Sequence, residues 1–130
     1  MTNLEDILAR LWTNVEGCRV AALAGMDGLL IERHPAPAAE GTLRQSPEPE
    51  DMAHVVADLT SVLGIVAGEL SRTVGGRVDE VIALGERGGY LARRIDDDLF
   101  CLVLVGASAE LANVRKQVEQ TSRELAVAVA

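Results

Sequence analysis

The sequence of 130 residues predicts a single α+β domain in which helices cover both faces of an antiparallel sheet. Three segments place apolar residues at helical spacing, and five shorter segments between them have the composition of strands. The turns between consecutive strands are too short for anything but antiparallel pairing. One predicted strand, at residues 99–105, is apolar on both faces, so helices must cover each side of the sheet.

Local sequence signals mark where the elements begin and turn. Thr2 and Glu5 form a capping box for the first helix, and Ser108 is a favourable N-cap for the last. Asp27 and Gly28 favour a tight hairpin turn between the first two strands, because both positions tolerate a positive φ. The predicted helices are residues 3–15, 51–74 and the segment from Ser108 onward; the predicted strands are residues 19–24, 29–33, 77–84, 90–95 and 99–105, with turns at 85–89 and 96–98.

Residues 34–50 separate the hairpin from the central helix and contain all four prolines of the sequence. Proline removes a backbone donor and disrupts both helices and central strands, so we expect a flexible surface loop here. A chain of 130 residues is large enough for one core and too short for two ordinary domains. Residues 1–130 are therefore expected to form one domain with the element order α-β-β-α-β-β-β-α.

The predicted central helix sorts its side chains by size into three faces. Valine and leucine occupy one wide stripe, small residues a second stripe beside it, and polar residues a narrow third face. A helix that covers one core needs a single apolar stripe, and Gly64 and Gly68 each cost a helix interior roughly 1 kcal/mol relative to alanine. We therefore expect another backbone to approach the small stripe closely, either the protein's own sheet or a partner helix. The small stripe comprises Ala53, Ala57, Thr60, Ser61, Gly64, Ala67, Gly68 and Ser71.

The composition disfavours several classes of partner. Twelve basic residues against twenty acidic ones give a formal charge of −8, which argues against nucleic acids and anionic membrane surfaces. No uninterrupted apolar run approaches the ~20 residues that cross a bilayer, and the N-terminus lacks the features of a signal peptide. We expect a cytoplasmic protein whose two cysteines, Cys18 and Cys101, stay reduced and pack as small apolar residues.

The sequence offers few catalytic options, and we expect no enzyme, no metal and no cofactor. It lacks the H-E-x-x-H, C-x-x-C, G-x-S-x-G and P-loop motifs. The acidic residues 96–98 could attract a hard cation, but neighbouring residues at a hairpin turn point in different directions, which favours a plain acidic turn. An arginine can stabilise phosphoryl transfer in trans, yet nothing singles out one of five candidates. These are Arg72, Arg77, Arg87, Arg93 and Arg94, which we interpret as surface charges.

The order of the predicted elements resembles the Roadblock/LC7 family. The matching stretches are residues 20–31 around the Asp27-Gly28 turn, the helix from Met52 with its many small residues, and residues 89–91 leading into 99–105. The resemblance implies a five-stranded antiparallel sheet in the order 2-1-5-4-3, with the central helix on one face and the terminal helices on the other. It also implies a homodimer formed through the central helix and the strand at residues 77–84.

The resemblance further implies a function. Members of this family act as non-enzymatic scaffolds or regulators of Ras-like small GTPases, and the bacterial regulators of gliding motility and polarity accelerate GTP hydrolysis without an arginine of their own. The predicted dimer interface is Ala53, Ala57, Ser61, Gly64, Gly68, Ser71, Val78 and Glu80; the predicted GTPase-facing residues are His54, Asp58, Glu69 and Arg72. The alternative is a small-molecule-sensing domain of the profilin-like or PAS-like kind, which would need a cavity lined by a few polar groups.

Overall fold

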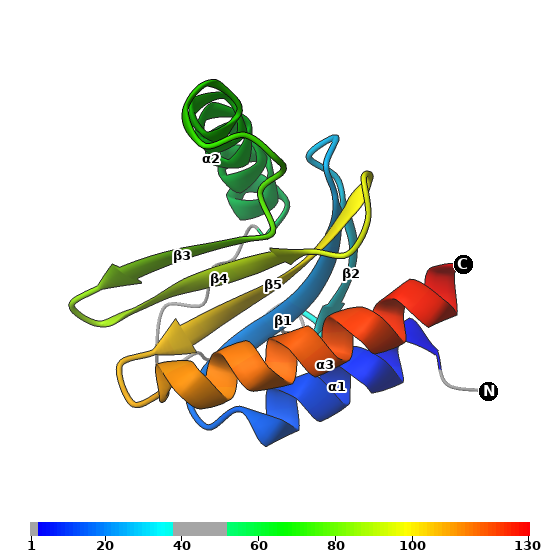
Figure 1. Ribbon diagram of the computed structural model, residues 1–130. Helices are drawn as coiled ribbons and strands as arrows, with labels where there is room; N and C mark the ends of the chain where they lie inside the picture. Colours follow the sequence, from blue (N-terminus) through cyan, green and yellow to red (C-terminus); the bar gives the residue numbers. More distant parts are fainter. Residues whose placement is uncertain (1–2, 38–51) are drawn as a thin grey trace.

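The computed structural model describes residues 3–37 and 52–130, and it contains the eight predicted elements in the predicted order. Thr2 and most of the predicted loop at residues 34–50 lie outside the described residues. Figure 1 shows α1 and α3 together on one face of the sheet and α2 on the other. The helices are α1 (Leu4–Asn14), α2 (Met52–Thr73) and α3 (Leu111–Val129); the strands are β1 (Cys18–Gly25), β2 (Leu30–His34), β3 (Glu80–Gly85), β4 (Gly88–Arg94) and β5 (Leu99–Gly106).

All neighbouring strands of the sheet are antiparallel, and their order β2-β1-β5-β4-β3 confirms the expected fold. β5 is the central strand, in which Leu102 pairs with Ala22 of β1 on one side and Ala92 of β4 on the other. Residues 100–103 are at most 1% exposed. The apolar pattern on both faces of this strand therefore follows from its central position, with a helical layer above and below it.

Alternating side chains of β5 divide the core into two layers. Cys101 and Val103 belong to the layer between the sheet and α1 with α3, whereas Phe100 and Leu102 belong to the layer beneath α2. α1 and α3 together contribute Ile7, Leu8, Leu11, Val114, Val118 and Leu125 to the first layer. The buried residues that α2 contributes to the second are Met52, Val56, Leu59 and Leu63, with Val55 partly buried beside them, all within the first twelve residues of the helix.

The starts of two helices differ from the prediction. α1 is capped by Asn3, whose Oδ1 atom accepts a hydrogen bond of 2.8 Å from the backbone N–H of Asp6. α3 begins at Leu111 after Glu110, which makes no side-chain capping bond, so Ser108 is not the N-cap. Ser108 instead lies against Gly17, within the turn that joins α1 to β1.

The strands of the β3–β4 hairpin also differ from the prediction. β3 begins at Glu80, because residues 77–79 form a connection that is bonded to β4 through the side chain of Arg94. The glycines at both ends of the predicted turn at residues 85–89 pair within the sheet, leaving only two turn residues. A Cβ atom at Gly88 would overlap the carbonyl oxygen of Val105, so close strand contact requires glycine there. The glycines at residues 85–89 therefore indicate both a turn and a close contact between β4 and β5.

Both cysteines lie in strands, as predicted. Burial raises the pKa of the Cys18 thiol from 9.0 to about 12, against a smaller lowering by its contact with the carbonyl of Val20. Burial, together with a smaller effect of the nearby Cys18, also raises the pKa of the Cys101 thiol to about 12. At neutral pH both groups are therefore protonated and unreactive.

These thiols should resist alkylation while the protein is folded. At pH 8 we expect iodoacetamide to modify Cys101 on the order of 1,000-fold more slowly in the native protein than in guanidinium chloride, because only the thiolate reacts and raising the thiol pKa from 9.0 to about 12 lowers the thiolate fraction by that factor. Mass spectrometry of peptides quenched at timed intervals measures the rate at each cysteine separately. A free cysteine peptide under both conditions controls for the effect of denaturant on the reagent. Equal native and unfolded rates would contradict the burial of these groups.

Candidate functional site

α2 is only partly covered by its own chain. Four of its 22 residues are buried, and Leu63 is the last of them. Val74, which directly follows the helix on the same stripe as Val56, is 78% exposed. Ile65 lies on the outer face and is 70% exposed. The helix therefore offers apolar surface that the described part of the chain does not cover.

The N-terminal part of the small stripe meets the protein's own hairpin. Gly28, in the β1–β2 turn, has a φ of +91°, and a Cβ atom there would lie 3.3 Å from Oγ1 of Thr60 and 3.8 Å from Cα of Ala57. Small side chains at Ala57 and Thr60 leave room for this turn. Part of the small stripe is thus explained by a contact within the chain.

The glycines of the small stripe have no such contact. Among the described residues, no atom outside the helix backbone comes within 4 Å of a Cβ atom built on Gly64. A Cβ atom on Gly68 would meet only Nη1 of Arg72, at 3.5 Å and on the same helix. The sheet therefore does not approach these two glycines, and a partner helix stays the prediction for them.

The opposite flank of α2 faces β4, the strand next to the β3 edge of the sheet. Val55 and Val62 border a hollow of about 160 Å³ together with Tyr90 of β4. Val62 is 46% exposed and Tyr90 is 37% exposed. We call these three residues the valine flank; it is missing from the predicted interface. The sequence held a signal for it, since the valine and leucine stripe was wider than one core requires.

The β3 edge lies beside this flank. Among the described strands, β3 pairs only with β4 and forms the end of the sheet. Val78 packs on the core layer beneath α2. The Glu80 carboxylate is 11% exposed and pairs with Arg115 at 2.8 Å and Arg93 at 3.6 Å, so its side chain is already engaged on the α3 side. The edge thus offers backbone groups rather than the Glu80 side chain.

All four predicted GTPase-facing residues lie on the outer surface of α2. Nε2 of His54 is 3.2 Å from Oδ2 of Asp58, and both side chains are 72% exposed. Arg72 pairs with Glu69 one turn apart near the other end of the helix. Exposed pairs of this kind contribute little to stability, about 1 kcal/mol at most, so these charges are available to a partner at small cost.

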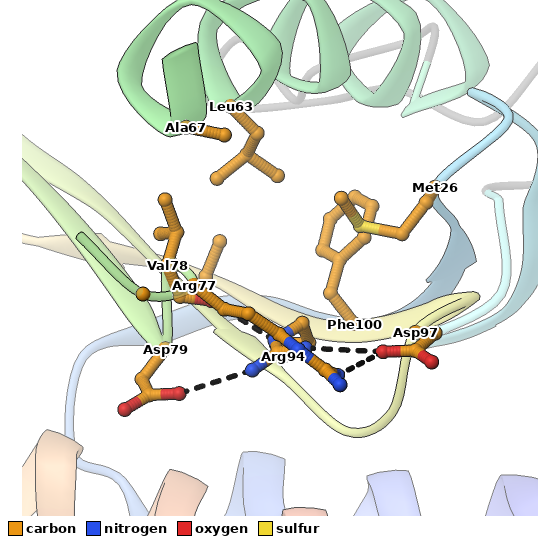
Figure 2. A pocket seen from close by; sticks show the side chains of 11 residues that line it. Met26, Leu63, Ala67, Arg77, Val78, Asp79, Arg94, Asp97 and Phe100 are labelled. Atoms are coloured by element: carbon orange, nitrogen blue, oxygen red, sulfur yellow. Dashed lines mark hydrogen bonds and ion pairs between the residues drawn. The ribbon is translucent and has the colours of Figure 1, made fainter. Parts of the chain in front are cut away.

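A cavity lies beneath the C-terminal half of α2, and Figure 2 shows it from close by. Its volume is about 310 Å³. Nε of Arg94 donates to the carbonyl of Val78 at 3.0 Å, and its Nη2 lies 3.2 Å from Asp79. Arg94 and Arg77 both pair with the same oxygen of Asp97. This α2 cavity is lined by Met26, Leu63, Ala67, Gly76, Arg77, Val78, Asp79, Ala92, Arg94, Asp97 and Phe100.

The acidic turn at residues 96–98 has a structural role. Oδ1 of Asp96 accepts hydrogen bonds from the backbone N–H groups of Asp98, at 2.8 Å, and Leu99, at 2.9 Å. Residues 3–37 and 52–130 hold no group of three or more histidine, cysteine or acidic side chains placed to bind a metal.

α2 has a second property that bears on its surroundings. By length and composition it is apolar enough to cross a membrane, although the sequence contains no uninterrupted apolar run of that length. Core helices of soluble proteins pass the same test, so this property alone assigns no membrane role. The composition of α2 does show that an unusually apolar helix lies largely exposed in one copy of the chain.

The fold is that of Roadblock/LC7 domains. A Roadblock/LC7 domain from Streptomyces avermitilis superposes with a TM-score of 0.81 at 17% identity, covering 98% of each chain. The gliding protein MglB from Thermus thermophilus gives 0.80 at 16% identity, covering 95% of this chain and 85% of MglB. Myxococcus xanthus MglB gives 0.76 at 16%, covering 97% and 96%.

Within this class the architecture is therefore MglB-like, as the resemblance predicted. Sequence comparison finds no matching family model and no matching curated protein. The likeness is thus one of fold.

The contact between Gly28 and α2 can be tested against a matched glycine. Gly28→Ala should destabilise the protein more than Gly75→Ala, because both residues have a positive φ but only Gly28 has atoms of another element nearby. Backbone strain alone costs about 1 kcal/mol, and displacement of α2 should add to it at Gly28. Urea unfolding measures both free energies. Equal losses would show that the turn does not press on the helix.

Proposed function

We propose that this chain is a non-enzymatic homodimeric scaffold or regulator that binds a Ras-like small GTPase. The observation that carries the proposal is the exposure of α2, an apolar helix of 22 residues with four buried side chains. Monomeric proteins seldom leave large apolar patches uncovered, and such patches mark interaction sites. The MglB-like fold supports the proposed class of partner, and acceleration of GTP hydrolysis is the finer part of the same proposal.

The dimer would form through α2 and β3. An edge strand carries unpaired N–H and C=O groups, so two β3 strands could pair and continue the sheet across the interface. That pairing would bring the two valine flanks together, because this flank faces β4, the strand next to the β3 edge. The sequence-based interface also includes Val78 and Glu80 of the edge segment, but on α2 it uses the small stripe, whose Gly64 is open to a partner helix. The two arrangements place different residues in the interface.

Two substitutions distinguish these arrangements. We expect Val62→Glu to raise the dimer dissociation constant roughly tenfold or more, because it would bury a charge among apolar side chains. Gly64→Leu tests the small stripe, since the new side chain meets no other element within a single copy. Val127→Glu is the matched control, an exposed valine on α3 that should leave the dimer intact. Analytical ultracentrifugation measures the dissociation constants, and circular dichroism checks folding.

Each outcome assigns the dimer interface to a different surface of α2. Loss of the dimer in Val62→Glu alone assigns the valine flank, and loss in Gly64→Leu alone assigns the small stripe. A wild-type protein that is monomeric at micromolar concentration would contradict the dimer itself.

GTPase binding is tested with a Ras-like GTPase from the same genome, loaded with GDP or a non-hydrolysable GTP analogue. We expect calorimetry to show at least about tenfold preference for one nucleotide state, because a regulator must distinguish the two. His54→Glu should weaken this binding while leaving the dimer intact, since His54 is exposed on the outer surface of α2 and does not border the hollow at the valine flank. Phosphate release with and without the protein tests acceleration of hydrolysis. If the dimer is intact but binds the GTPase in neither nucleotide state, the proposal of a GTPase partner is wrong and the proposal of a dimer stands.

A second candidate function is favoured by the α2 cavity. Small-molecule sensing requires a concave, mostly apolar space with a few polar groups, and this partly open cavity provides one. No pattern in the sequence indicated it, because its walls combine Met26 with residues 63–79 and 92–100, which only folding brings together. The chemistry of its walls narrows the class of ligand.

A further inference from the structure

We propose that the α2 cavity binds a neutral aromatic small molecule of one or two fused rings. Its volume of about 310 Å³ lies at the lower end of the roughly 300–1,000 Å³ that ligand sites span. The cavity is on the inner side of α2, whereas the proposed GTPase surface is on its outer side. Ligand binding here therefore does not depend on the GTPase proposal.

The cavity exists because small residues face it where the helix leaves the sheet. Ala67 of α2 and Ala92 of β4 line the space, and Gly76 borders it just after the helix. Leu63 is the last buried residue of α2, so the helix turns beyond it contribute no buried side chain to the core layer. Water in this space would be surrounded mainly by carbon atoms, which makes it readily displaced by an apolar ligand.

The chemistry of the walls favours an aromatic ring. The walls include the aromatic side chain of Phe100 and the thioether of Met26, both drawn in Figure 2. Sulfur atoms and aromatic rings attract each other, and a planar guanidinium stacks on ring faces. Arg94 supplies that guanidinium, held by Val78, Asp79 and Asp97. A flat ring would meet all three kinds of surface at once.

The charges at the rim favour a neutral ligand. Arg77 and Arg94 face Asp79 and Asp97, so two positive groups are balanced by two negative groups. An anionic ligand would compete with Asp97 for its arginines, and a cationic ligand would compete with the arginines for Asp97. A neutral ligand leaves these pairs in place, whereas a cationic ligand that took Asp97 would leave Arg94, whose side chain is only 20% exposed, with one partner fewer.

The experiment uses indole as the probe, with indole-3-acetate and tryptamine as its anionic and cationic counterparts. Calorimetry with the full-length protein should give an indole dissociation constant at least tenfold lower than that of either charged analogue. Amide chemical shifts should change at Met26, Ala67 and Phe100. An absence of indole binding up to millimolar concentration, or tighter binding of a charged analogue, would overturn the proposal.

Ala67→Leu fills the cavity from α2 and should weaken indole binding at least tenfold. Ala112→Leu is the matched control, because Ala112 lies exposed on α3, outside the predicted dimer interface, and does not line the cavity. Met26→Ala removes the thioether at the exposed rim without enlarging a helix residue, and should weaken binding several-fold even if Ala67→Leu fails to fold. Unchanged affinity in a folded Ala67→Leu variant, or in Met26→Ala, would overturn the assignment. Binding of a GTPase without binding of indole would overturn this inference alone.

Discussion

The pairing of β5 with β1 and β4 is the interaction on which the rest of the structure depends. Leu102 has a strand neighbour on each side and a helical layer above and below. Such a strand can alternate its side chains between two cores only if every position is apolar, and residues 100–103 meet that demand. Both core layers are therefore built on the same strand. The two faces of the sheet differ in how many helices cover them: two on one face and one on the other.

This asymmetry determines which surface is available for function. α1 and α3 share one face and bury each other's apolar sides there, together with the sheet. α2 lies alone on the other face and is held mainly through its N-terminal part. A single helix cannot cover a five-stranded sheet, so the α2 side keeps exposed apolar surface in one copy of the chain. Recognition sites therefore concentrate on the α2 side for reasons of packing alone.

The sequence predicted the topology better than the candidate site, because the signals for topology are local or strongly patterned. The two-faced strand placed β5 at the centre, and short turns made the strands antiparallel. The glycines at residues 85–89 looked like a loop because their strand role depends on the carbonyl of Val105, a residue distant in sequence. Helical periodicity likewise specifies the faces of α2, but only tertiary packing brings Gly28 to Thr60 and the valine flank to the β3 edge.

The small stripe shows how one sequence pattern can have several physical causes. At Ala57 the small side chain makes room for the β1–β2 turn, and at Ala67 it leaves space for the α2 cavity. Gly64 and Gly68 are explained by neither contact, because no other element approaches them within the described chain. Alanine would favour the helix more at those two positions, which is why we propose that a second chain lies against them. Two glycines and the valine flank thus indicate a partner, and this set is narrower than the whole stripe and easier to test.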